Sequence, residues 1–125
     1  MIWKGKRTQL QDDNIVVMSV DGELWANLPL YLDEVNHSPT GFEWGYYGSG
    51  PSQLAYAILR SYFELVEKLD VTTAISQAKR HYARFKQAYV AKWSEEWKIT
   101  SDEIELVWLT GERVGWVGDE RDGWV

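Results

Sequence analysis

The sequence predicts an α+β domain in which a small N-terminal antiparallel sheet and an ordered loop precede two long antiparallel helices and one short helix. Three observations carry this prediction: a β-branched apolar run that meets an Asp-Gly pair, a Gly-Pro pair followed by apolar residues at helical spacing, and a second helical pattern after a short break. At 125 residues the chain has the usual length of one domain. We expect it to bury roughly two thirds of the surface that its unfolded form exposes.

The first strands are predicted from residues 15–20, which read Ile-Val-Val-Met-Ser-Val and are followed at once by Asp21-Gly22. Asp-Gly between apolar runs indicates a β-hairpin, because both central positions of a type I′ turn need positive φ. Residues 23–26 then form the returning strand. Residues 2–7 are expected to supply a third strand, since a lone two-stranded hairpin is only marginally stable.

Two long helices are predicted in the middle of the chain. The first begins near Gly50-Pro51, where the glycine caps the helix and the proline takes the first helical position. A break near Asp70 separates it from the second, and a short connection makes the two helices antiparallel neighbours. The apolar stripe of the first is Leu54, Ile58, Tyr62 and Leu65, flanked by Ala55, Leu59, Phe63 and Val66; that of the second is Ala74, Ala78, Tyr82, Phe85, Tyr89 and Trp93.

A third, short helix is predicted to run from Thr100 through about residue 109, with Ile104, Val107 and Trp108 facing inward. Thr100 and Glu103 have the spacing of a capping box, in which each side chain binds the backbone amide of the other residue. We assign residues 1–111 to the domain and residues 112–125, which contain Gly-Trp-Val twice, to a tail. This tail either adds a small hairpin to the sheet or offers its tryptophans to a partner.

Composition excludes several classes of function. The chain has no cysteine, which rules out disulfides, thiolate zinc sites and cysteine nucleophiles. It has two histidines and no metal-ligand spacing, so neither a metal nor a cofactor is expected. The formal net charge of −6 makes nucleic acid an unlikely partner, because phosphate binding depends on lysine and arginine. No apolar stretch has the length of a membrane span or a signal peptide core, so we expect a cytoplasmic protein without membrane contact.

The candidate site is the loop at residues 36–50, which reads Asn-His-Ser-Pro-Thr-Gly-Phe-Glu-Trp-Gly-Tyr-Tyr-Gly-Ser-Gly. The loop ends at the first turn of a predicted helix, where free backbone amides and the positive end of the helix dipole favour the binding of an anion. The residues that we expect to contact a ligand come from this loop and the first helical turn: Asn36, His37, Ser38, Thr40, Glu43, Trp44, Tyr46, Ser49, Gly50 and Gln53.

These residue types favour a non-enzymatic binding module, such as an inhibitor or a nucleotide binder, whose partner is a protein or a small anionic ligand. The alternative is a small hydrolase or transferase that acts on a phosphorylated substrate. In that alternative His37 is the general acid or base, Glu43 orients it, and the helix terminus stabilises developing negative charge. The same stretch also fits a purely structural role, because a glycine-rich turn without the lysine of a phosphate-binding loop is a weak signal.

The second histidine, His81, belongs to the second predicted helix. Basic residues surround it in the sequence: Lys79, Arg80, Arg84 and Lys86. A charge run of this kind is typical of a solvated basic face, and a patch that faces an anion is the alternative.

Residues 36–46 read Asn-His-Ser-Pro-Thr-Gly-Phe-Glu-Trp-Gly-Tyr, and residues 48–55 read Gly-Ser-Gly-Pro-Ser-Gln-Leu-Ala. This block resembles the signature of a family of small bacterial and bacteriophage proteins of unknown function, the DUF6166 type. The resemblance extends more thinly over residues 1–109, and the chain departs from the family pattern at Tyr47, where a small residue is expected, and in its Gly-Trp-Val tail. The resemblance implies a cytosolic protein encoded by a bacterium or a phage, and it implies no particular reaction.

Overall fold

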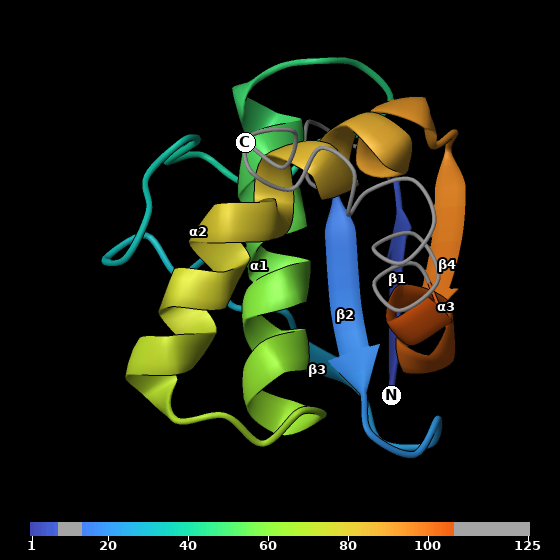
Figure 1. The fold of residues 1–125 in the computed structure, drawn as a ribbon. Helices are drawn as coiled ribbons and strands as arrows, with labels where there is room; N and C mark the ends of the chain where they lie inside the picture. The colour runs from blue at the N-terminus through green and yellow to red at the C-terminus, as the bar shows by residue number, and fades with distance from the viewer. Residues whose placement is uncertain (8–13, 107–125) are drawn as a thin grey trace.

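The computed structural model of the chain describes residues 1–7 and 14–106. A small antiparallel sheet lies beside two long helices (Figure 1), which confirms the predicted α+β fold. In chain order the elements are β1 (Ile2–Lys6), β2 (Ile15–Ser19), β3 (Ala26–Asn27), α1 (Ser49–Leu65), α2 (Val71–Ala88), the 3-10 turn η1 (Val90–Lys92), β4 (Glu96–Thr100) and α3 (Ser101–Leu106).

The sheet has the strand order β3-β2-β1-β4, with β1 between two antiparallel neighbours. This confirms the strand predicted at the N-terminus. Burial alternates along β1, where Trp3 and Gly5 are buried and Lys4 and Lys6 are exposed, because successive side chains point to opposite faces of a sheet. The Trp3 indole donates a hydrogen bond of 2.9 Å to the Ser61 hydroxyl of α1. The helices therefore cover the Trp3 face of the sheet.

The hairpin of β2 and β3 is confirmed, but its connection is wider than the predicted two-residue turn. Strand β2 ends at Ser19 and β3 begins at Ala26, so residues 20–25 form the connection. Of the Asp-Gly pair, Gly22 alone has positive φ, at 85°, whereas a type I′ turn needs it at both positions. The Asp21 carboxylate instead accepts hydrogen bonds from the amides two and three residues further on, at 2.8 and 3.1 Å. These bonds stabilise the longer loop.

The fourth strand, β4, was not predicted. Its sequence Glu-Trp-Lys-Ile-Thr alternates polar and apolar residues, and Trp97 and Ile99 are buried while Glu96 is exposed. This period of two was therefore a readable signal. Trp97 pairs with Gly5 of β1, where a Cβ atom would lie 2.5 Å from the indole ring. A glycine is required at this position because the ring occupies the space of any side chain.

Helix α1 is the centre of the core. Its residues from Gly50 to Phe63 are all buried, which is typical of a helix that is surrounded by protein on every side. The helix begins at Ser49, with Gly48 as its N-cap, rather than at the predicted Pro51. Pro51 is tolerated at the third helical position because the first four amides of a helix have no partner within it. Of the predicted stripe, Leu65 is 39% exposed.

Helix α2 begins as predicted, with the Asp70 carboxylate accepting a hydrogen bond of 2.7 Å from the Thr73 amide. It ends at Ala88, however, and does not continue to Trp93. The chain turns through η1, where the Val90 carbonyl accepts a hydrogen bond of 3.0 Å from the amide of Gly45. The Trp93 ring then stacks on Trp97 of β4, with ring centroids 4.2 Å apart. The prediction for Trp93 was wrong because contacts with the loop and the sheet outweigh helical spacing.

The capping box before α3 is confirmed. The Thr100 amide donates to the Glu103 carboxylate at 2.9 Å, and the Glu103 amide donates to the Thr100 hydroxyl at 3.2 Å. Ile104 is buried as predicted. The predicted inward residues Val107 and Trp108, and the tail at residues 112–125, lie outside the described residues. Within the described part of the chain, no helix combines the length and apolarity that a membrane span requires.

Candidate functional site

A polar hollow of about 500 Å³ lies between the predicted loop and the first turn of α1. We call it the ligand hollow. Six of the predicted site residues line it together with Asn14, Gly41 and Phe42: Ser38, Thr40, Glu43, Tyr46, Ser49 and Gly50. The structure therefore brings together about half of the expected contact set, and it places Asn36, His37, Trp44 and Gln53 elsewhere.

Arg7 holds the side of the loop that carries Glu43. Its guanidinium donates to the Glu43 carboxylate at 2.5 Å and to the Trp44 carbonyl at 2.6 Å. It also lies 3.3 Å from the carboxylate of Glu95, just before β4. Glu43 is thus paired with Arg7, rather than orienting His37 as the enzymatic alternative required. No local pattern in the sequence connects Arg7 to a loop 36 residues away.

The first turn of α1 meets the loop closely at Gly50. A Cβ atom there would lie 2.5 Å from the Cβ of Glu43, so the loop packs directly on the helix backbone. Gly48 has no side chain to cap the helix, and the first turn contains no acidic residue. Ser49 is exposed and lines the ligand hollow. An anion in the hollow would therefore meet the positive end of the helix without a competing carboxylate from the helix itself.

Gln53 lies under the loop, fully buried. Its amide oxygen accepts from the backbone amides of His37 and Ser38 at 2.7 and 3.1 Å. Its amide nitrogen donates to the carbonyls of Leu30 and Val35 at 2.7 and 2.9 Å. All four bonds go to the backbone of the preceding segment, so Gln53 fixes the shape of the loop and does not line the hollow.

Trp44 is also fully buried, and its ring lies in the core. The indole nitrogen donates to the Ser94 carbonyl, and the ring packs edge-on against Trp97 with centroids 5.7 Å apart. Tyr46, two residues further on, is 49% exposed and lines the ligand hollow. The aromatic residues of the loop are thus divided between the core and the hollow.

His37 lies beside α2 rather than in the ligand hollow. Its ring centroid is 5.0 Å from that of Tyr82. Burial, and then the positive charge of Lys86, lower the pKa of the imidazole below its usual value. Asn36 is exposed and does not line the hollow. An acid or base that acts in the ligand hollow must line it, whereas the His37 ring packs against Tyr82.

Sequence reasoning missed a buried ionic network on the same face of α1 as Gln53. Arg60 is 4% exposed and binds Glu34 through two nitrogens, at 2.8 and 3.1 Å, and Glu64 at 2.6 Å. The Tyr56 hydroxyl donates to the same Glu34 at 2.7 Å, and burial followed by this bond raises the pKa of Tyr56. Residues 53, 56 and 60 share one helical face, so polar residues at this spacing were the available signal.

A second hollow of about 370 Å³ adjoins the ligand hollow. Asn14, Gly41 and Phe42 line both. The remaining residues around the second hollow are mostly aliphatic: Ile15, Val16, Leu28 and Leu30, with Asn27. The two hollows together form a site whose polar end is the ligand hollow and whose apolar end is the second hollow.

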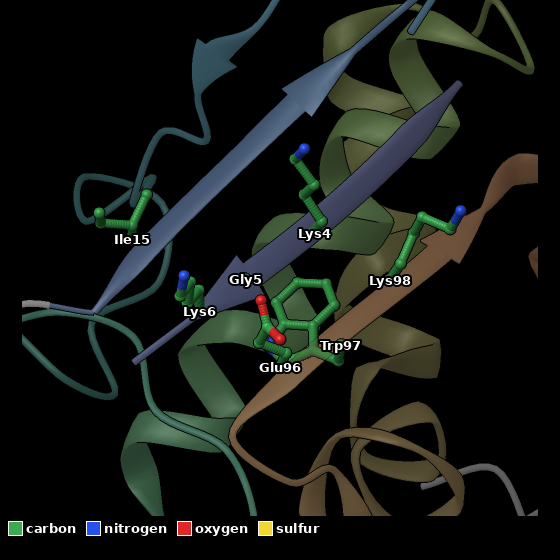
Figure 2. A pocket seen from close by; sticks show the side chains of 7 residues that line it. All are labelled: Lys4, Gly5, Lys6, Ile15, Glu96, Trp97 and Lys98. Carbon is green, nitrogen blue, oxygen red and sulfur yellow. The ribbon is translucent and has the colours of Figure 1, made fainter. Parts of the chain in front are cut away.

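A third hollow, of about 630 Å³, lies on the outer face of the sheet (Figure 2). It is lined by Lys4, Gly5, Lys6, Ile15, Glu96, Trp97 and Lys98. Sequence reasoning did not anticipate this surface, because it depends on β4 pairing with β1. The signal was the alternation of charged and buried residues in both strands.

His81 is buried, 5% exposed, which contradicts the predicted solvated face. It belongs to the stripe Ala74, Ala78, His81 and Phe85, which has helical spacing and faces the core. Its ring lies 6.2 Å from that of Phe63. Burial, and then the charge of Arg80, lower the pKa of His81 to about 4.

We expect acidification to destabilise the protein through His81. The unfolded chain binds a proton near the ordinary histidine pKa of about 6.5, whereas the folded chain does so only near 4, so stability is full above pH 6.5 and falls toward pH 4. The contribution of this group is about 3 kcal/mol. Urea unfolding of wild type and His81→Gln between about pH 7.5 and 4 measures it. An equal pH dependence in the two proteins would contradict the assignment.

Comparison with models of protein families gives a match over most of the chain. A model of a family of unknown function, DUF6166, matches residues 3–111. No curated protein and no solved structure gives a significant match to the chain.

Proposed function

The chain belongs to the DUF6166 family, whose function is unknown, and we propose from its own geometry that it is a non-catalytic binding protein. In this proposal the ligand hollow takes the anionic group of a small ligand. The observation that carries it is the hollow itself, a polar space of about 500 Å³ around which six of the predicted contact residues gather. Clefts of this size with a few convergent polar groups are typical of ligand sites.

The hydrogen-bond donors and the helix terminus around the ligand hollow support an anionic group. Glu43 is the carboxylate that lines it, and the guanidinium of Arg7 compensates its charge at 2.5 Å. The exposed residues Thr40 and Ser49 provide hydroxyl donors. The uncapped first turn of α1 adds favourable electrostatics on the same side.

The adjoining apolar hollow favours a ligand with a flat or apolar part beside its anionic group. Phe42 and Gly41 lie between the two hollows and line both. A nucleotide has this character, with a phosphate for the hydroxyl end and a base for the aliphatic end. The alternative of a phosphate-handling enzyme has less support, because His37 packs against Tyr82 and Glu43 is bound to Arg7.

A thermal-shift measurement with nucleoside monophosphates and the corresponding unphosphorylated nucleosides tests this function. A ligand at about 100 times its dissociation constant adds roughly 2.7 kcal/mol to stability. We expect a rise in Tm with the phosphorylated compounds and a much smaller rise with the nucleosides. Thr40→Tyr fills the ligand hollow and should abolish the shift, whereas the matched exposed change Thr72→Tyr on α2 should preserve it.

Two results would overturn the proposal. One is the absence of a shift with every phosphorylated compound. The other is a shift that Thr40→Tyr and Thr72→Tyr leave equally intact, because the binding would then lie outside the ligand hollow. A turnover of substrate that is lost in His37→Ala would instead favour the enzymatic alternative.

A further inference from the structure

Three lysines lie together on the outer face of the sheet, away from the helices (Figure 2). Lys4 and Lys6 come from β1, and Lys98 comes from the neighbouring strand β4. They surround the outer hollow of about 630 Å³ together with Glu96 and Ile15. This surface does not depend on the ligand hollow.

The register of the sheet places Lys4 directly opposite Lys98. Like charges directly opposite each other destabilise a sheet, so this arrangement works against folding. Lys6 lies opposite Glu96 in the same register, but among residues 1–7 and 14–106 no ion pair within 4 Å involves Lys4 or Lys98. Lys4 instead lies 4.1 Å from the centre of the Trp25 ring. A negatively charged partner would relieve the repulsion between the lysines.

We propose that this face of β1 and β4 docks an acidic segment of a partner protein. Carboxylates of the segment would face Lys4, Lys6 and Lys98, and an aliphatic residue would contact Ile15, which is 51% exposed at the rim of the hollow. Complementary charge of this kind steers association and fixes orientation.

A nucleic acid fits the same face less well. A continuous phosphate backbone is bound through many lysine and arginine contacts along its length. Three lysines are few for backbone binding, and Glu96 lies among them. The ring of Trp25 faces Lys4 and is not among the residues that line the hollow. A short acidic segment needs only a few favourable contacts, and it can avoid Glu96.

Fluorescence anisotropy of the full chain with a short labelled peptide of glutamate and isoleucine tests the proposal. The variant K4Q/K6Q/K98Q should bind this peptide about tenfold more weakly than wild type, and the binding should weaken with added salt. K68Q/K79Q/K92Q is the matched control, because it removes the same charge from three exposed lysines outside the face and should leave the affinity unchanged. The charge-retaining variant K4R/K6R/K98R should restore binding.

Three results would overturn the proposal: equal affinity of the face variant and wild type, equal weakening in the control variant, or tighter binding of a single-stranded oligonucleotide than of the peptide. Lysines on edge strands also prevent aggregation, so loss of solubility in the face variant is a foreseeable complication. In that case Lys4→Gln alone, on the central strand β1, should still weaken peptide binding by about twofold to threefold. Unchanged affinity in Lys4→Gln would overturn the proposal equally.

Discussion

Gln53→Leu is expected to lower the free energy of unfolding by about 4 kcal/mol or more. Leucine fills a similar volume but removes both the acceptor for the amides of His37 and Ser38 and the donor to the carbonyls of Leu30 and Val35. A buried backbone group that loses its partner costs about 1 to 3 kcal/mol. One of the four bonds is fully buried and three are partly buried, so the summed loss is a large part of the stability of a small domain, which is about 5 to 15 kcal/mol.

Urea unfolding followed by circular dichroism measures this loss. Gln87→Leu is the matched control, because it makes the same chemical change at an exposed position of α2, where an effect within about 0.5 kcal/mol is expected. A ligand-contact role predicts the opposite pattern: Gln53→Leu would keep its stability and lose only ligand affinity. That outcome would show that the four backbone bonds do not hold the loop.

The fold was predictable wherever a local pattern decided the structure. The Thr100 and Glu103 capping box and the break before α2 depend on neighbours in sequence, and both were predicted. The ends of elements were less predictable. Trp93 continues the helical spacing of α2 perfectly well, but its ring stacks on Trp97 after the chain has turned. The spacing of apolar residues in α2 carries no information about the position of the Trp97 ring.

The candidate site was predictable as a place but not as a set of side chains. Glycines and a helix start indicate a shaped loop, and six of the expected residues do line one hollow. Residue type alone did not reveal which polar side chains form hydrogen bonds or ion pairs within the protein itself. Gln53 and Glu43 are both plausible ligand contacts in sequence, yet one binds four backbone groups and the other binds Arg7. Partners that are distant in sequence therefore decide which side chains stabilise the loop and which can contact a ligand.

Trp44→Ala should be comparably destabilising, by about 3 to 5 kcal/mol, because it leaves a large cavity in the core. The ring is fully buried against Trp97, and the guanidinium of Arg7 lies 4.6 Å from its centre. The substitution also leaves the Ser94 carbonyl without its indole donor. Trp44→Phe separates these effects, since it keeps most of the apolar contact and loses the hydrogen bond, at an expected cost of about 1 to 2 kcal/mol.

Tyr47→Ala is the internal control for Trp44→Ala. Tyr47 lies in the same loop and is 65% exposed, so its removal should change the free energy of unfolding by less than about 0.5 kcal/mol. The midpoints of urea unfolding measure the difference in stability between the variants, provided that the dependence of the unfolding free energy on urea concentration is the same in each. Equal losses at positions 44 and 47 would mean that the loop acts as one packed unit. A large loss at Trp44 alone would show that its ring anchors the loop to the core and leaves the exposed residues free to face a ligand.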